Sequence, residues 1–408
     1  MKNTFKYILF IIFLYFLFFN PPFYIFRGRL VLSNVIAGLS LIIAIIKPNI
    51  VRSHIRQHSK LFSLFFVLFL FVLLRSLVSG ETSFITQHLL GLIGIFITLP
   101  LVFEYARRNG FGDNEQITRA IMIAASIGAL ITLYCVINPN FHAYLKYTVI
   151  RYNENDFLYN VDYRGFGFAN QLTSDYGFMM GIFFSIGIYC LNNNKWIIPF
   201  LPLFILAALL NARTGFIVAI FGLISYILFS RKKIRSIWGI GLATIGMFLV
   251  GNFIVSRVAF SASTEDWLGV FMDELFSVAQ ERDVQGSATA NALLTRMWVL
   301  PSTFSEWLFG KGISIFLLSD GVTKTSDVGW ILQLNYGGLI YSIILWSAFL
   351  YVFKDLFRKG NYVMFFFLLS SFIIINTKCS IYPRTGFIHL YMMLYFIAAK
   401  EKEGLQHS

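Results

Sequence analysis

Charged residues are scarce in this sequence, and their scarcity excludes an ordinary soluble globular protein. Only 13% of the 408 residues are charged, whereas 57% are hydrophobic, and soluble domains usually approach one quarter charged. Apolar stretches such as residues 61–79 and 236–255 are long enough to cross a bilayer core of about 30 Å. Because transmembrane helices satisfy their own backbone hydrogen bonds, the sequence predicts an all-α, polytopic integral membrane protein.

Cysteine is also rare, which argues against a disulfide framework and against thiolate metal sites. The three cysteines, Cys135, Cys190 and Cys379, are scattered through apolar sequence and form no CxxC pair. The six histidines are spread along the chain, and there is no DxD motif of the kind that holds a nucleotide sugar. We therefore expect no metal ion and no cofactor.

Breaks between the apolar runs predict about twelve transmembrane helices, with both termini on one side of the membrane. The N-terminal run lacks a small-x-small cleavage site, so we expect it to be a retained first span. One side of this topology carries 19 Lys and Arg against six Asp and Glu, which is the whole net charge of +13. The positive-inside rule makes this side cytoplasmic, so the charge indicates orientation and anionic-lipid contact, with no nucleic acid as partner. The predicted spans are 7–26, 30–46, 61–79, 85–103, 120–138, 173–191, 196–211, 214–230, 236–255, 328–353, 362–377 and 384–399.

Two predicted outer loops are longer than the others. One covers residues 139–172, and the larger one covers residues 256–327, between the ninth and tenth spans. The whole chain, residues 1–408, is expected to form a single membrane domain around them. Apolar residues in the larger loop recur at helical spacing, which predicts short amphipathic helices on the outer membrane surface, with a loosely ordered linker as the alternative. These residues are Leu268, Phe271, Met272, Leu275, Val278 and Ala279.

Arg213 is the one charge within residues 200–229, and apolar sequence flanks it on both sides. A guanidinium keeps its charge, and placing it at the centre of a membrane costs roughly 3 kcal/mol or more. The predicted topology puts it at an outer turn, where the next helix begins and free amide groups favour an anion. Arg213 is therefore a candidate phosphate clamp, the alternative being an arginine that extends to lipid headgroups. The pentapeptide RTGFI recurs at residues 384–388 and adds Arg384 as a second outer cation.

The end of the first long loop combines aromatic, amide and charged side chains. Arg164 follows Tyr163 within the sequence DYRGFGF, and Gln171 and Asp175 follow at the mouth of the next span. Aromatic faces stack on sugar rings, while amides and carboxylates bond sugar hydroxyls, so this segment is a candidate sugar site. An aromatic belt at the membrane interface is the alternative.

The second long loop supplies further cations and two carboxylates. Arg296 and Lys311 are the cations, and Asp320 and Asp327 stand just before a long span that begins near Trp330. An aspartate near several arginines at a membrane mouth is a candidate general base toward a hydroxyl. Asp327 directly precedes the span, so a helix N-cap is the alternative for that residue.

Taken together, these elements resemble the O-antigen polymerase (Wzy-type) family, which shares a superfamily with the O-antigen ligases. The resemblance covers most of the chain. It consists of many spans, two enlarged outer loops, an RGFGF element, an ARTG turn, and LFGKG, SDVGW and YGG around the end of the second loop.

The resemblance implies a metal-independent glycosyltransferase of the bacterial inner membrane, active at the periplasmic face in lipopolysaccharide biosynthesis. Its substrates would be oligosaccharide repeat units on undecaprenyl pyrophosphate, and a chain-length regulator is an expected partner besides membrane lipid. Mapped onto this sequence, Arg164, Arg213 and Arg296 would hold the donor pyrophosphate. Asp327, or else Asp320, would activate the acceptor hydroxyl.

Two alternatives remain open at this point. The related ligases usually carry a histidine just before the span after the large loop, where this sequence has Asp327, and no histidine occurs from residue 143 to 388. This difference favours a polymerase over a ligase. The other alternative is a flippase for lipid-linked oligosaccharides, which would need charged residues deep in its spans. Arg75 is the only charge well inside a predicted span.

Overall fold

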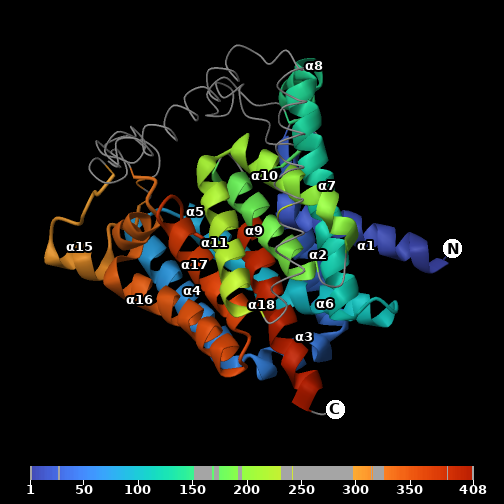
Figure 1. Cartoon of the computed structure of the whole chain (residues 1–408). Coiled ribbons are helices and arrows are strands. Elements are labelled where there is room, and N and C mark those ends of the chain that lie inside the picture. Colours follow the sequence, from blue (N-terminus) through green and yellow to red (C-terminus); the bar gives the residue numbers. More distant parts are fainter. Residues whose placement is uncertain are drawn as a thin grey trace. The chain divides into compact units, whose positions relative to one another are not determined.

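Helices make up almost all of the regular structure in the part of the chain that is described (Figure 1). The computed structural model describes residues 2–25, 28–150, 168–169, 174–191, 195–230, 241, 297–313, 315, 326–383 and 385–406. Within these ranges a single short hairpin departs from the pattern, with β1 (Pro22–Ile25) antiparallel to β2 (Gly28–Val31). Apart from this hairpin, the predicted helical fold is confirmed.

Within the described residues, four helical segments are long and apolar enough to cross a membrane. α2 (Leu32–Ile46) and α3 (Pro48–Gln57) add a fifth if these two helices, bent by 100°, form one broken span. The length and hydropathy of these helices indicate a membrane protein, in agreement with the sequence. The four segments are α4 (Ser59–Ser79), the run Phe84–Arg108 made of α5 (Ser83–Ile93), η1 (Gly94–Thr98) and α6 (Leu99–Arg108), then α7 (Asn114–Ile137) and α16 (Gly329–Arg358).

Five shorter apolar helices of 10–17 residues lie where the sequence predicts further spans. The total of twelve spans stays a prediction, because the ninth predicted span (236–255) is described only at residue 241. The amphipathic pattern of residues 268–279 lies outside the described residues. The shorter helices belong to α1 (Lys2–Phe19), η3 (Lys195–Phe200) with α10 (Leu201–Leu209), α11 (Arg213–Phe229), α17 (Tyr362–Asn376) and α18 (Thr385–Gln406).

The chain divides into two compact units. The first comprises Met1–Val35 and Tyr105–Asp273, and the second comprises Ile36–Glu104 and Glu274–Ser408. The single membrane domain expected from the sequence stays a prediction, as do the extents of the two outer loops. The first of these loops begins with α8 (Pro139–Tyr144) and η2 (Leu145–Val149).

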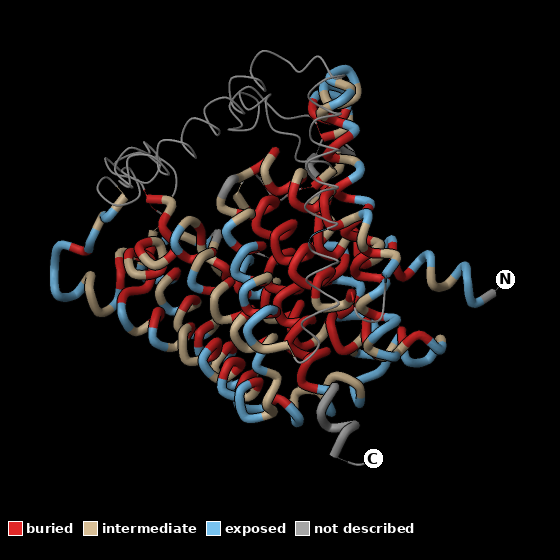
Figure 2. Tube along the Cα trace, viewed as in Figure 1, coloured by how far each residue is buried: buried red, intermediate tan, exposed pale blue. Residues whose placement is uncertain are grey.

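The first unit contains a helix that is buried on every side. α9 (Ser174–Cys190) is buried continuously from Asp175 to Ile188 (Figure 2). A helix that is apolar all around its circumference is expected in such a position. Within this unit α9 packs most extensively on α11 and α10, and α1 packs along α7.

α9 and α11 approach so closely that their backbones touch. A Cβ atom on Gly181 would overlap the carbonyl oxygen of Gly215, and a Cβ on Gly215 would overlap that of Gly177. Gly177 and Gly181 form a GxxxG spacing, which permits close helix contact in membranes. Because Gly177 also faces Ala212, the residue before α11, the two helices begin at the same end and run parallel.

The second unit is held by aromatic packing among four helices. The ring of Phe349 on α16 lies 4.6 Å from that of Phe372 on α17 and 5.5 Å from that of Tyr391 on α18, measured between centroids. Phe65 extends the cluster to α4 at 6.3 Å. Large apolar groups from segments far apart in the sequence therefore form one core, which positions the polar residues of α16.

We expect Gly181→Ala to separate α9 from α11 and to lower the stability of the first unit. Its methyl group would overlap backbone that cannot move aside, and overpacking of this kind costs about 1–3 kcal/mol. The measurement is the unfolding temperature of the purified protein in detergent. Gly38→Ala in α2 is the control, because a Cβ there meets nothing within 4 Å. Equal unfolding temperatures for the two variants would contradict the backbone contact.

Candidate functional site

Five of the predicted site residues lie in the described part of the chain, and the structure places them in two groups. Asp175 and the backbone of Arg213 belong to the first unit, whereas Lys311, Asp327 and Trp330 belong to the second. The predicted gathering of arginines around a pyrophosphate stays a prediction. The other predicted residues, Tyr163, Arg164, Gln171, Arg296, Asp320 and Arg384, lie outside the described residues.

In the first unit, the glycine contact brings two predicted site positions to the same end. Asp175 is in the first turn of α9 and is buried, and Arg213 is the first residue of α11. A Cβ on Gly177 would lie 2.9 Å from the Cβ of Ala212, so the first turns of the two helices adjoin. The structure therefore places Asp175 and the Arg213 backbone in neighbouring helix starts, which sequence distance alone did not show.

In the second unit, α16 corresponds to the predicted span 328–353 but is broken within it. Gly338 interrupts it with φ 65° and ψ −162°. Trp330 and Trp346 are 16 positions apart, which corresponds to about 24 Å along a straight helix, yet their ring centroids are 5.3 Å apart. Residues 329–337, the folded-back segment, therefore turn back beside the remainder of α16, so the predicted span 328–353 contains a break at Gly338.

The break in α16 leaves carbonyl groups that the helix cannot satisfy, and a tight turn at Gly310–Gly312 satisfies them. The amide of Lys311 donates to the carbonyl of Asn335 at 2.5 Å, and the amide of Gly312 donates to that of Tyr336 at 2.9 Å. Gly310 and Gly312 have φ of 71° and 76°, a conformation that only glycine adopts readily. The LFGKG and YGG elements of the sequence are thus two halves of one structure.

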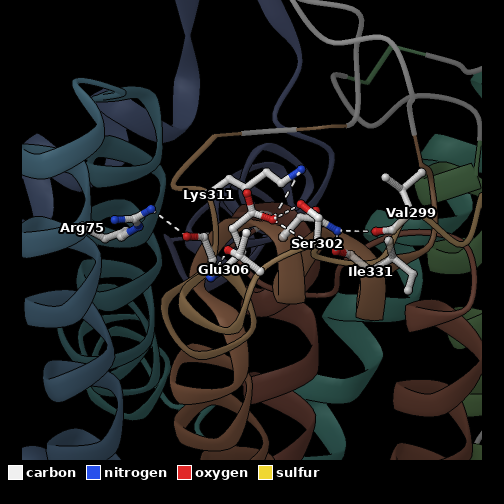
Figure 3. A network of polar contacts seen from close by, with 9 residues as sticks. Arg75, Val299, Ser302, Glu306, Lys311 and Ile331 are labelled. Carbon is white, nitrogen blue, oxygen red and sulfur yellow. Dashed lines mark hydrogen bonds and ion pairs between the residues drawn. The ribbon is translucent and has the colours of Figure 1, made fainter.

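Arg75 holds this turn from α4. Its Nη2 donates to the carbonyl of Gly310 at 2.6 Å, and Figure 3 shows the guanidinium directed toward the turn. A Cβ on Gly312 would lie 3.0 Å from the Nε of Arg75. In the sequence, Arg75 stands out only as the one charge well inside a predicted span. That unusual position is the feature from which its contact with the turn could have been suspected.

Two segments of the larger loop, around residues 297–299 and at residue 326, meet beside the start of α16. The side-chain amide of Asn335, which is fully buried, donates to the carbonyl of Val299 at 2.6 Å and to that of Ile331 at 3.0 Å (Figure 3). Ser326 donates through its hydroxyl to the carbonyl of Met297 at 2.7 Å. A small apolar cluster fills the space between these bonds, formed by Ile315, Val328 and Ile331 with Met297, Val299, Trp330 and Leu332.

A short helix, α15 (Phe304–Phe309), precedes the turn and begins with a capping box. Thr303 accepts the amide of Glu306 at 3.2 Å, and the Glu306 carboxylate accepts the amide and hydroxyl of Ser302, each at 2.8 Å. These bonds, first that from the Ser302 amide, lower the pKa of Glu306 below its ordinary value. The Lys311 ammonium lies 3.9 Å from the same carboxylate.

Asp327 forms an ion pair and does not cap α16. Its Oδ2 accepts a hydrogen bond from the Nζ of Lys378 at 2.5 Å, across the turn that follows α17. The N-cap position belongs to Val328, which makes no side-chain capping bond, and the amide of Val328 donates instead to the hydroxyl of Ser326 at 3.1 Å. The N-cap alternative for Asp327 is therefore wrong.

Gln333, in the folded-back segment, is the centre of a buried polar network. Its amide donates to Asn376 at 2.8 Å and to Ser380 at 3.0 Å, and its carbonyl oxygen accepts from the indole of Trp346 at 3.0 Å. Trp330 is half-buried and packs edge-on against Trp346. These bonds join both parts of α16 to the end of α17.

The second unit thus offers two cations at the turn, Arg75 and Lys311, and an aspartate–lysine pair beside buried amides. Such groups can bind anions and hydroxyl-bearing ligands. In the described residues, no group of three or more His, Cys, Asp or Glu side chains could hold a metal ion. His54 and His58 lie four positions apart, and their rings pack 4.7 and 4.8 Å from that of Phe396.

Comparison of the sequence with known protein families finds no match, and comparison with curated proteins finds none either. The helices define the class, a helical membrane protein. Its activity has to be argued from the residues themselves.

We expect Gln333→Leu to lower the unfolding temperature of the purified protein in detergent. The change removes the Gln333 amide to which the polar atoms of Asn376 and Trp346 are hydrogen-bonded. An unpaired buried polar group costs about 1–3 kcal/mol. Ser370→Ala on α17 is the control, because Ser370 donates only to Phe367 of its own helix. A Gln333 variant as stable as the control would mean that the network does not hold α16 to α17.

Proposed function

We propose that the protein is a polymerase of lipid-linked oligosaccharides, similar to the O-antigen polymerases of the Wzy type. The observation that carries this proposal is the folded-back segment, because it joins elements that the resemblance picked out separately. The LFGKG turn bonds the YGG break, and SDVGW provides Ser326, Asp327 and the start of α16. Non-helical backbone at membrane depth is tolerated where it is buried in protein or lines a polar cavity.

The proposed topology has about twelve spans, both termini in the cytoplasm and the active face in the periplasm of a bacterial inner membrane. The distribution of charge supports this orientation, since the net charge of +13 lies on the expected cytoplasmic side. The larger loop, residues 256–327, then faces the periplasm. Both undecaprenyl-pyrophosphate substrates would reach the site from the outer leaflet of that membrane.

In the proposed reaction, the bond between the donor's anomeric carbon and its pyrophosphate breaks, and undecaprenyl pyrophosphate leaves. A hydroxyl oxygen of the acceptor sugar forms the new bond to that carbon, and its proton passes to a carboxylate. Arg164, Arg213 and Arg296 would stabilise the departing pyrophosphate. Asp327 is the favoured carboxylate, with Asp320 as the alternative, and Lys378 would orient Asp327 through their ion pair.

A ligase would use the same donor chemistry and differ in its acceptor. Reconstitution separates the two, because a polymerase needs only lipid-linked repeat units in detergent. A flippase would need a membrane and would leave the units unjoined. Elongated products from purified protein would therefore support the polymerase over both alternatives.

We expect Arg213→Ala to remain folded and to lose chain elongation by about 10²–10³-fold, the usual cost of removing one donor to a developing anion. Arg213→Lys should also be slow, because an ammonium cannot make the two parallel bonds of a guanidinium. The measurement is product length on gels after incubation with defined lipid-linked repeats. Arg358→Ala, in the last turn of α16, is the control. An unchanged ladder for Arg213→Ala would remove Arg213 from the site.

We expect Asp327→Asn to reduce elongation by about 10²–10⁴-fold if the carboxylate accepts the acceptor's proton. Asn is close to Asp in size, so the fold should be retained. Asp355→Asn is the matched control, because Asp355 pairs with Lys359 at 3.2 Å on the same helix. Full elongation by the Asp327 variant would shift the base role to Asp320 or to another group.

A further inference from the structure

Arg75 is half-buried, and its guanidinium makes fewer hydrogen bonds to the described residues than it has donors. A guanidinium has five N–H donors, and the one bond that the structure gives Arg75 goes from Nη2 to the carbonyl of Gly310. Its Nε is buried and makes no hydrogen bond. A buried, charged donor without an acceptor is costly, so this atom points to an acceptor that lies outside the described residues.

The charges around the Gly310–Gly312 turn favour an anion as that acceptor. Arg75 makes no ion pair with an acidic side chain in the described part of the chain. Lys311, in the turn itself, adds a second cation whose side chain is 32% exposed. The carboxylate of Glu306 is already bonded by the amide and hydroxyl of Ser302, and lies 3.9 Å from the Lys311 ammonium.

The position of the turn along α4 corresponds to the level of lipid headgroups. Arg75 lies four residues before the end of α4 at Ser79, about 6 Å along the axis, and a long side chain covers that distance. Beside the turn, Trp298, Phe304 and Phe309 are exposed by 52%, 78% and 45% although they lie outside the spans. Tryptophan is enriched at the membrane–water interface, and the two exposed phenylalanines add apolar surface beside the turn.

We propose that Arg75 and Lys311 bind a phosphate group carried by a membrane lipid. Arg75 donates Nε to a phosphate oxygen while Nη2 keeps its bond to Gly310, and the Lys311 ammonium supplies the second charge. The assignment of that lipid to a substrate rests on the proposed function. A polymerase joins two lipid-linked units, each with its own pyrophosphate, so it needs a second diphosphate site in addition to the one that contains Arg213.

The experiment measures equilibrium binding of a labelled polyprenyl diphosphate to the full chain in phosphatidylcholine nanodiscs. The assay is run in the wild type and in the Arg213→Ala background, which leaves the second site to be seen alone. Lys311→Gln removes the charge but keeps the main-chain bond to Asn335, and Arg75→Gln removes the guanidinium. We expect each change to weaken binding about tenfold, because each removes a charged donor to the phosphate, and Arg75→Lys to restore part of the affinity.

Lys359→Gln is the matched control, because Lys359 also pairs with a carboxylate, Asp355, at similar exposure on α16. Binding that is unchanged in both Arg75→Gln and Lys311→Gln would overturn the site. Equal competition by phosphatidylglycerol would assign it to phospholipid headgroups and overturn its identification with a substrate. Failure of the wild type to elongate repeat units would overturn the proposed function, while loss of binding in the two variants would still support the phosphate site.

Discussion

A backbone carbonyl buried in a protein must find a donor within the protein, because water cannot reach it. The second unit meets this constraint at Gly338. The break leaves the carbonyls of Asn335 and Tyr336 without partners in the helix, and the amides of Lys311 and Gly312 donate hydrogen bonds to them. A turn that precedes α16 in the sequence therefore becomes part of its hydrogen bonding, and neither element would be stable in this form without the other.

The contacts among the polar groups of the second unit depend on this break in α16. Once the chain folds back, Gln333 can reach Trp346, although a straight helix would separate them by about 20 Å. The same reversal brings Asp327 beside Lys378 at the end of α17. Polar residues in a membrane are expensive, and here their bonds to one another offset that cost.

The sequence was a good guide to features that depend on average composition over a whole span. The runs 61–79, 85–103 and 120–138 correspond to α4, to Phe84–Arg108 and to α7, because twenty apolar residues have few alternatives to crossing a bilayer. The break in α16 was missed, since Gly337 and Gly338 lie in an apolar run and glycine is common in transmembrane helices. What breaks the helix is a partner turn that hydropathy does not reveal.

The candidate site was predicted less completely, for a related reason. Lys311 and Asp327 were identified by residue type, but their partners come from distant positions, as does the bond between Arg75 and Gly310. The capping role considered for Asp327 is wrong because α16 starts at Gly329, so the N-cap position falls on Val328. The TxxE capping box at Thr303 and the GxxxG spacing at Gly177 were both readable locally. Neither pattern depends on residues distant in the sequence.

The parallel contact of α9 with α11 has a consequence for how the protein is made. Only α10 and the short η3 segment separate the two helices, so residues 174–229 contain every group that this contact requires. The contact can form as soon as the third of these helices leaves the translocon, long before the C-terminal helices are synthesised. These helices would then be the first part of the first unit to assemble, and they would do so during translation.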